Sequence, residues 1–181
     1  MDREALETRI RQLVTGREND MAAKAGRRDM LPLFADREAL EALIPYLAAP
    51  YRGHVDCVCA PESLGFIVGS MLARELGVGF VGIRRNRQFP ADEDGILMAR
   101  YIDHRDQVTS LSTGKLLLPE ESRVLLADNW IETAATLQAC MNIIEDAGCR
   151  LAGIAAVGAD YRSAAKSLID DGLVRCVVLE K

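Results

Sequence analysis

The sequence predicts an α/β fold in which a mostly parallel, twisted sheet carries helices on both faces. Helical and extended patterns alternate along the chain, and this order is typical of parallel sheets. One apolar run, Val124–Ala127, suits a strand that is buried on both faces. With 181 residues, 49% of them hydrophobic, the chain can build one sizeable core, so we expect a single domain over residues 1–181.

Apolar spacing and helix-ending glycines place the individual elements. In chain order we expect helices at 2–15 and 37–48, a strand at Val55–Ala60, a helix at Phe66–Leu76, strands at Gly79–Ile83 and Val124–Ala127, a helix through Leu137 and Ile144 that stops at Gly148, a strand at Ala152–Val157, a helix at Ser163–Asp170 and a strand at Leu173–Leu179. Ligands bind such sheets at the carboxyl ends of the strands, where Glu62, Arg84 and Asp128 are expected to emerge.

The pattern weakens between Gln88 and Arg123. An acidic turn at Asp92–Gly95 and short apolar stretches favour a hairpin or a flexible flap, which we place at about residues 88–113. A lid at this place would exclude water from a reaction beneath it.

Composition and charge exclude several classes of protein. The net charge of −5 argues against nucleic acid as a partner, because such partners select for a basic surface. No apolar segment is long enough to cross a membrane, and the charged first residues are unlike a signal peptide, so we expect a cytoplasmic protein without membrane contact. The five cysteines lie mostly in apolar runs without paired metal spacing and are expected to be buried, reduced thiols.

The stretch Val124–Thr136, which reads VLLADNWIETAAT, carries the strongest functional pattern. Its apolar run gives way to Asp128-Asn129, and small or hydroxylated residues then lead into a helical pattern. Backbone N–H groups at a helix N-terminus bind phosphate, and a carboxylate at a strand end can hold sugar hydroxyls or a hydrated magnesium ion. We therefore expect a phosphate and sugar site around Asp128.

This segment resembles the signature of the type I phosphoribosyltransferases. In that family four apolar residues precede two acids, two further apolar residues and a T-G-G-T-like phosphate loop. Here the second acid is replaced by Asn129, Glu132 precedes the loop, and residues 133–136 read T-A-A-T.

Two further segments are similar to adenine phosphoribosyltransferases, in the same order along the chain. Residues 55–85 resemble that family's strand, E-S/A-R-G-F turn, helix, second strand and basic pair, with Leu64 in place of the arginine. Residues 26–44 resemble its F-R-D-I-T-P-L segment and the helix that follows, with Arg27 in place of the aromatic residue that stacks on the base. The resemblance spans roughly residues 26–158 and implies a type I phosphoribosyltransferase fold.

The resemblance also implies roles for individual residues, with Asp128 and Glu132 taking part in catalysis and Mg²⁺ bound to Asp128 through water. The implied sets are, for the ribose and 5-phosphate of phosphoribosyl pyrophosphate (PRPP), Asp128, Asn129, Glu132, Thr133, Ala134, Ala135 and Thr136; for pyrophosphate, Glu62, Ser63, Leu64, Arg84, Arg85 and Arg87; and for the base, Arg27, Arg28 and Trp130.

Two of these residues have open alternatives. Glu132 either accepts a proton from a purine ring nitrogen or is a solvated loop residue. Trp130 either supplies a stacking surface for the base or fills the core. The acid of the family's I-E-L run is missing from Val157–Ala159. Adenine is therefore expected to be a poor substrate.

The leading hypothesis is an enzyme that transfers the 5-phosphoribosyl group from PRPP to a purine-like base and releases pyrophosphate. The alternative is a non-catalytic regulatory protein that binds PRPP or another ribose phosphate on the same fold, because a fold alone does not determine function. A purely structural partner subunit is the weakest hypothesis, since Asp128 and the small-residue loop are retained. The resemblance further implies a homodimer.

Overall fold

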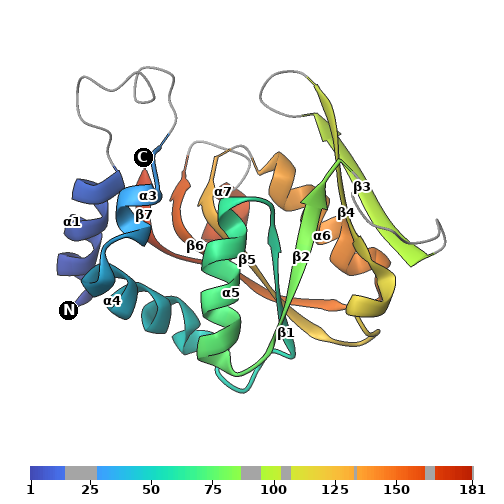
Figure 1. Ribbon diagram of the computed structural model, residues 1–181, viewed down its shortest axis with the longest axis horizontal. Coiled ribbons are helices and arrows are strands. Elements are labelled where there is room, and N and C mark those ends of the chain that lie inside the picture. Colours follow the sequence, from blue (N-terminus) through green and yellow to red (C-terminus); the bar gives the residue numbers. More distant parts are fainter. Residues whose placement is uncertain (15–27, 87–94, 103–106, 133, 162–165, 181) are drawn as a thin grey trace.

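The computed structural model describes residues 1–14, 28–86, 95–102, 107–132, 134–161 and 166–180. Within these ranges seven strands form one sheet in the order β3-β4-β2-β1-β5-β6-β7 (Figure 1). The strands are β1 (Cys57–Pro61), β2 (Gly79–Arg85), β3 (Ile96–Ile102), β4 (Val108–Gly114), β5 (Arg123–Ile131), β6 (Arg150–Asp160) and β7 (Val174–Glu180). Neighbours from β2 to β7 run parallel, whereas β4 is antiparallel to β2 and β3. The predicted α/β class and mostly parallel sheet are confirmed.

Helices cover both faces of the sheet, as the two buried clusters show. Helices α1 (Arg3–Val14), α3 (Leu31–Phe34), α4 (Arg37–Ala48) and α5 (Leu64–Leu76) contribute to a cluster on one face, and α6 (Ala135–Asp146) contributes to a cluster on the other. The short α7 (Lys166–Asp170) packs against the second cluster, and two 3₁₀ turns lie at Ala49–Tyr51 and Lys115–Leu117. Side chains of β5 alternate between the clusters, with Leu125 and Ala127 in the first and Val124 and Leu126 in the second.

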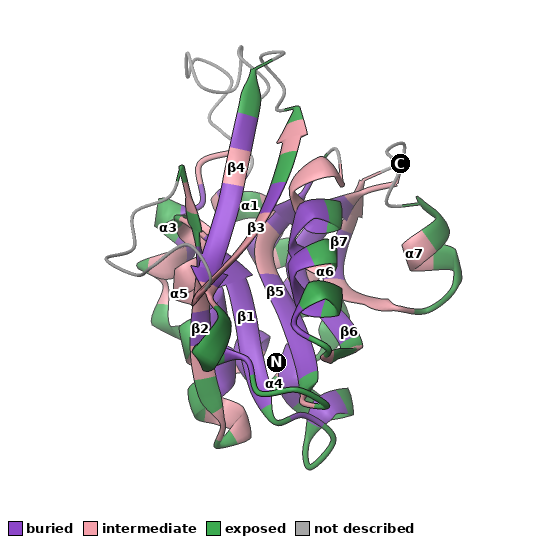
Figure 2. Ribbon diagram, turned by 90° about the vertical axis from the view of Figure 1, so that its right-hand side faces the viewer, coloured by how far each residue is buried: buried purple, intermediate pink, exposed green. Residues whose placement is uncertain are grey.

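Strand β5 lies in the interior of the sheet, next to the central strand β1, and most of its residues are buried (Figure 2). It pairs with β1 from Cys57↔Val124 to Cys59↔Leu126. Just before this ladder, the backbone N–H and guanidinium of Arg123 donate to both carboxylate oxygens of Asp56, at 2.7–3.0 Å. These hydrogen bonds lower the pKa of Asp56 to about 2. A forked contact of this kind opposes a slip of one strand against the other.

The observed boundaries lie within two residues of the sequence expectations for most elements, whereas β5 and β6 (Arg150–Asp160, expected at Ala152–Val157) extend further than expected. Strand β5 does not end before Asp128 but continues to Ile131, because β6 is long enough to pair with it as far as Ile131↔Ala159. Asp128 therefore lies within a strand rather than after one. The helix expected at Ser163–Asp170 is described only from Lys166, since residues 162–165 lie outside the described ranges.

The segment expected to form a hairpin or flap contains an antiparallel pair. Strands β3 and β4 align from Ile96↔Gly114 to Ile102↔Val108 and rise beyond the rest of the sheet in Figure 2. Ala99 and Leu111 anchor the pair in the second core cluster. Residues 87–94 and 103–106 lie outside the described ranges, and closure of this hairpin over a ligand stays a prediction.

All five cysteines are free thiols. Three are buried, as expected, whereas Cys149 and Cys176 are only half-buried. Loss of hydration raises the pKa of the Cys140 thiol well above its ordinary value, so this group stays protonated in the core. In the described part of the chain, no helix is both long and apolar enough to span a membrane.

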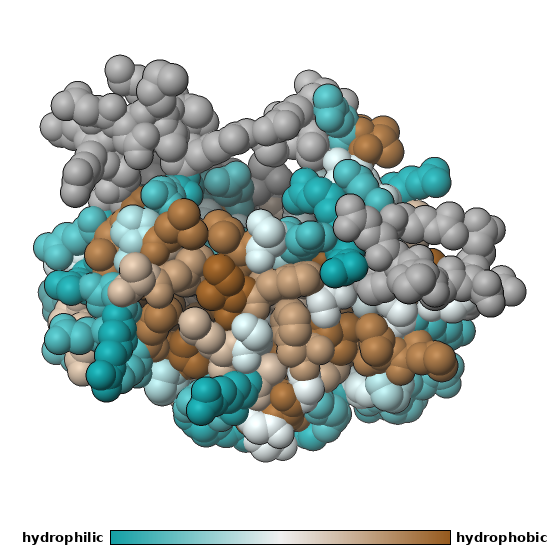
Figure 3. All heavy atoms as spheres, in the orientation of Figure 1, coloured by the Kyte–Doolittle hydropathy of each residue, from teal (hydrophilic) through white to brown (hydrophobic). Residues whose placement is uncertain are grey.

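Helix α5 packs very closely on β1, and glycine makes this approach possible. Figure 3 shows apolar side chains gathered over the middle of this face. The partly buried Leu64 and Met71 of α5 and Phe80 of β2 pack against the first cluster. A Cβ at Gly69 would lie 2.8 Å from the Cβ of Ala60 and 2.8 Å from Cε2 of Phe80. The contact with Ala60 cannot relax by a side-chain rotation, so any larger residue must move the helix.

We predict that Gly69→Ala lowers the free energy of unfolding by about 1 to 3 kcal/mol, because overpacking of this contact outweighs the better helix propensity of alanine. Urea denaturation would measure the change. Ser70→Ala, at an exposed position of the same helix, is the matched control and should leave stability nearly unchanged. A Gly69→Ala variant as stable as the parent would contradict this packing.

Candidate active site

A cavity of about 230 Å³ lies at the carboxyl edge of the sheet, where the predicted ligand site was placed. It is lined by Pro61, Glu62, Arg85, Tyr101, Asp128, Asn129, Trp130, Ile131, Glu132, Ala134, Thr136 and Leu137. The lining residues come from β1, β2, β3, β5 and the start of α6. Residues of the sugar, phosphate and pyrophosphate sets are thus brought to one place.

Asp128 is the half-buried carboxylate in this cavity. Its Oδ1 accepts the backbone N–H of Asn129 at 2.7 Å. Loss of hydration raises the pKa of Asp128 to about 7, and the charge of Glu132 adds to this shift while that of Arg85 opposes it. A Cβ at Gly65 would lie 3.2 Å from Asp128 Oδ1, so glycine allows the first turn of α5 to approach the carboxylate.

The predicted phosphate loop ends in a backbone conformation that suits anion binding. Ala134 is the N-cap of α6 and has φ 58°, in the left-handed region, which explains why the resembled family has glycine here. Ala134 has no side-chain acceptor to offer, so the N–H groups of the first turn of α6 are left for a ligand. Ala134 and Thr136 line the cavity, Ala135 is not among its lining residues, and Thr133 lies outside the described ranges.

The predicted pyrophosphate turn is held by Glu62. Its backbone N–H donates to the carbonyl of Ile83, and its Oε2 accepts the backbone N–H of Arg85 at 3.1 Å. The Glu62–Ser63 peptide bond is cis. Arg85 and Glu62 line both the main cavity and an adjoining hollow that also includes Ser63.

Two members of the pyrophosphate set point elsewhere. Leu64 packs against the first core cluster, so it does not replace the arginine of the resembled family at the cavity. Arg84 is exposed and is not among the cavity's lining residues, because alternate residues of β2 face opposite sides. Arg87 lies outside the described ranges.

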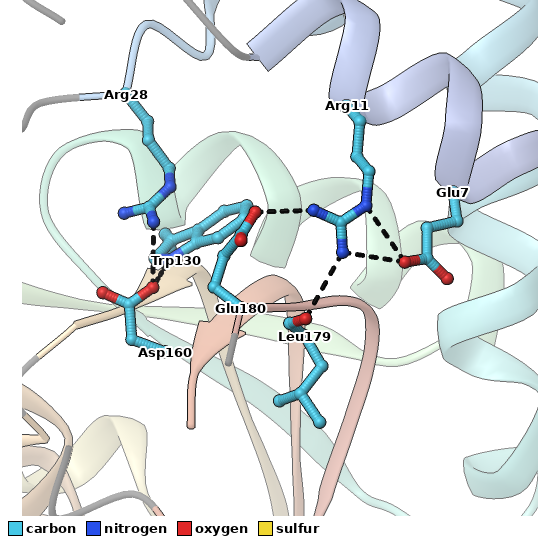
Figure 4. A network of polar contacts seen from close by, with 7 residues as sticks. All are labelled: Glu7, Arg11, Arg28, Trp130, Asp160, Leu179 and Glu180. Atoms are coloured by element: carbon cyan, nitrogen blue, oxygen red, sulfur yellow. Dashed lines mark hydrogen bonds and ion pairs between the residues drawn. The ribbon is translucent and has the colours of Figure 1, made fainter. Parts of the chain in front are cut away.

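The expected base-binding residues form a stack beside the cavity (Figure 4). The guanidinium carbon of Arg28 lies 4.1 Å from the ring centroid of Trp130. Asp160 Oδ1 accepts both the indole N–H of Trp130, at 2.9 Å, and Arg28 Nη2, at 3.0 Å. Trp130 is only 8% exposed and belongs to the first core cluster, so the alternative in which it fills the core is supported. Arg27 lies outside the described ranges.

The sequence patterns did not point to two residues at or near the cavity, Asp160 and Tyr101. Asp160 directly follows the strand segment in which an acid had been sought, and its position at the carboxyl end of β6 was the available signal. Tyr101 of β3 matches the family's flap sequence poorly, yet it lines the cavity. Its hydroxyl is buried and has no hydrogen-bond partner within the described residues. A ligand oxygen would supply one.

Comparisons with known proteins agree with this geometry. Residues 36–180 match the family described as "Phosphoribosyl transferase domain". The chain belongs to the phosphoribosyltransferase family. An adenine phosphoribosyltransferase of Nocardioides sp. is 34% identical over 133 residues, which cover 71% of this chain and 70% of the relative.

Solved structures of phosphoribosyltransferases have the same fold. The adenine phosphoribosyltransferase of Thermoanaerobacter pseudethanolicus superposes with a TM-score of 0.82 at 27% identity, covering 96% of this chain and 99% of that one. The enzyme from Rhodothermus marinus gives a TM-score of 0.84 at 23% identity, covering 97% and 99%, and supports the fold alone. The phosphoribosyltransferase fold and enzyme class expected from the sequence are confirmed.

We predict that Asp128→Asn makes this phosphoribosyltransferase more stable at pH 8, by about 1 to 4 kcal/mol, because each unit of pKa shift corresponds to about 1.4 kcal/mol. The folded protein binds a proton at Asp128 more tightly than the unfolded chain does. Its stability therefore falls as pH rises from about 4 to 7, and the loss is complete above 7.

Asparagine keeps the acceptor for the Asn129 N–H and removes the charge. Urea denaturation of parent and variant from pH 4 to 8 would measure this difference, which should vanish near pH 4. A difference that is independent of pH would contradict the raised pKa.

Proposed function

We propose that this protein transfers the 5-phosphoribosyl group from PRPP to a purine-like base and releases pyrophosphate. The observation that carries the proposal is that Asp128, Arg85 and the start of α6 line one cavity in a chain of the phosphoribosyltransferase family. A sugar, a phosphate and a pyrophosphate each need one of these groups. The similar proteins are named adenine phosphoribosyltransferases, which supports a purine as the acceptor.

Asp128 and Asn129 hold the ribose in this proposal. An ionised carboxylate accepts two hydroxyl hydrogen bonds, and an amide both donates and accepts. The 5-phosphate lies at residues 132–136, against the first N–H groups of α6. Ribose hydroxyls bound to Asp128 favour its charged form, so substrate lowers the pKa that burial has raised.

Pyrophosphate lies at the Glu62–Ser63 turn beside Arg85. In the reaction the bond from C1 of the ribose to the pyrophosphate oxygen breaks and a bond from C1 to a base nitrogen forms. The guanidinium of Arg85 stabilises the leaving pyrophosphate, and the surrounding carboxylates stabilise an oxocarbenium-like sugar. Glu132, whose side chain is 49% exposed, accepts the proton that the base nitrogen loses.

A magnesium ion fits this site only when the phosphate groups of the substrate supply part of its ligands. Among the described residues, no three His, Cys, Asp or Glu side chains are grouped so that they could hold a metal ion. Mg²⁺ keeps several waters and binds one or two carboxylates together with substrate phosphates. Asp128 is the carboxylate that would contact it through water, and the ion would supply charge neutralisation for pyrophosphate. A homodimer is also part of the proposal, supported by the family resemblance, and a cytoplasmic location stays a prediction from the composition.

Calorimetric titration with magnesium and PRPP, followed by an assay of pyrophosphate release, tests the proposal. We expect binding by the parent and a tenfold to hundredfold weaker affinity for Asp128→Asn, because a charged acceptor is worth about 1.5 to 3 kcal/mol. Binding without release of pyrophosphate with any base would instead support a regulatory protein. Equal affinity of parent and folded variant would refute the ribose site.

Adenine is predicted to be a poor substrate, although the similar proteins are named adenine phosphoribosyltransferases. Strand β6 carries no acid at Val157–Ala159, and the nearby Oδ1 of Asp160 already accepts two hydrogen bonds. Glu132 suits a base with an acidic N–H, such as a 6-oxopurine. Steady-state assays with adenine, hypoxanthine, guanine and xanthine should therefore give adenine the lowest kcat/KM, by about tenfold or more. A clear preference for adenine would show this interpretation to be wrong.

A further inference from the structure

A second cavity, of about 450 Å³, lies at the edge of the sheet where the parallel strands begin, opposite the candidate active site. Its lining residues come from the segment before β1, from the start of β6 and from the start of β7. None of them lines the main cavity. The volume falls in the usual range of small-molecule sites, about 300 to 1,000 Å³. An occupant of this cavity would therefore be distinct from the substrates of the proposed reaction.

Arg175 of β7 is a half-buried arginine in the wall of this cavity. Within the described ranges it makes no ion pair or hydrogen bond, and its buried Nε has no partner. Its guanidinium carbon lies 3.8 Å from the ring centroid of Tyr46 on α4, so stacking holds the plane in place. Stacking uses a face of the guanidinium, whereas its five N–H donors point outward in the plane. These donors are left for a ligand.

The lack of a carboxylate beside Arg175 is unlike the surroundings of other arginines in this fold. Ion pairs with Asp or Glu are made by Arg9, Arg11, Arg28, Arg37, Arg52, Arg123 and Arg150. The chain as a whole is acidic, with 27 Asp and Glu against 22 Lys and Arg, yet no acid lines this cavity. A partly buried cation without a counter-charge favours binding of an anion.

The other walls of the cavity add a second donor and an apolar surface. The exposed His54 has an imidazole that can donate an N–H, and Leu173 and Val174 supply apolar contacts. The hydroxyl of Tyr51 is already used, because it donates to the carbonyl of Ile154 at 3.2 Å. Burial raises the pKa of Tyr51 and the charge of Arg175 opposes this shift, which agrees with a guanidinium close to this wall.

We propose that this cavity binds a small organic anion. Its carboxylate or phosphate group contacts Arg175 and His54, and its apolar part packs against Leu173 and Val174. The planar fork of an arginine matches both of these anionic groups with two parallel hydrogen bonds. Because His54 belongs to the segment after α4 and Arg175 to β7, the occupant links these two parts of the chain and stabilises the folded protein.

Four test ligands separate the charge from the apolar contact. Phenyl phosphate and benzoate carry the two anionic groups on the same ring, benzyl alcohol lacks the charge, and inorganic phosphate lacks the ring. Each would be titrated calorimetrically, at millimolar concentrations, into the parent, Arg175→Gln and His54→Ala, with the shift in Tm as a second readout. Arg150→Gln is the matched control, because Arg150 is an exposed arginine at the start of β6 that does not line the cavity.

We expect at least one of the two aromatic anions to bind the parent and raise its Tm, with inorganic phosphate weaker and benzyl alcohol without effect. Arg175→Gln should weaken this binding about tenfold or more, as expected when a charge-assisted hydrogen bond is lost. His54→Ala should weaken it about two- to tenfold, and Arg150→Gln should leave it within about twofold of the parent. The tighter of the two anions shows whether the site prefers a phosphate or a carboxylate.

His54 keeps the test decisive if the loss of stacking on Tyr46 affects the folding of Arg175→Gln, which circular dichroism would show. His54 is exposed, so its replacement leaves the packing intact. Binding that is unchanged in both variants would place the anion elsewhere, such as in the main cavity, and would overturn the proposal. The same conclusion follows if neither aromatic anion binds the parent, or if benzyl alcohol binds as tightly as they do. An equal loss in Arg150→Gln would show a general effect of net charge and would refute the site too.

Discussion

The parallel pairing of β1 with β5 is the constraint on which the site depends. The ladder from Cys57↔Val124 to Cys59↔Leu126 sets the register, and two residues further along each strand stand Pro61 and Asp128. The turn proposed to bind pyrophosphate and the carboxylate proposed to bind the ribose therefore lie side by side at one edge of the sheet. A slip of one residue would turn the apolar side chains of β5 to the wrong faces, which both core clusters oppose.

The charged groups proposed to take part in the reaction are held in an electrostatically unfavourable arrangement in the cavity. Asp128 loses hydration and faces Glu132, with Arg85 as the compensating charge. Preorganised charges of this kind cost folding free energy and act on the transition state without having to rearrange. The tyrosine hydroxyl at position 101 is a smaller example, buried at the cavity without a protein partner in the described part of the chain.

The fold could be predicted from the sequence because its determinants are local. The apolar run Val124–Ala127 indicates a buried strand, and the apolar spacing that follows it indicates a helix. The end of β5 could not be located in this way, because pairing with β6 extends the strand past the first polar residue.

The candidate site was predictable only in part, for a similar reason. Asp128 and Thr136 belong to a contiguous motif and Arg28 was expected from the resemblance, but the pairing of Arg28 with Asp160, 132 residues away, was not. The sequence around either residue does not indicate that the other is its hydrogen-bond partner. The left-handed conformation of Ala134 could not be predicted from its residue type either, because alanine has no preference for that conformation.

The contact between α1 and β7 has a consequence for synthesis on the ribosome. Arg11 donates to the Glu180 carboxylate and to the Leu179 carbonyl, and the first of these contacts spans 169 residues (Figure 4). A helix of 12 residues is marginal on its own in water, and the partners of Arg11 on β7 are synthesised 168 and 169 residues after it. Helix α1 is therefore translated well before the strand that holds one side of it, and until β7 is made the growing chain must keep the apolar stripe of Leu6, Ile10 and Val14 from contacts with other molecules.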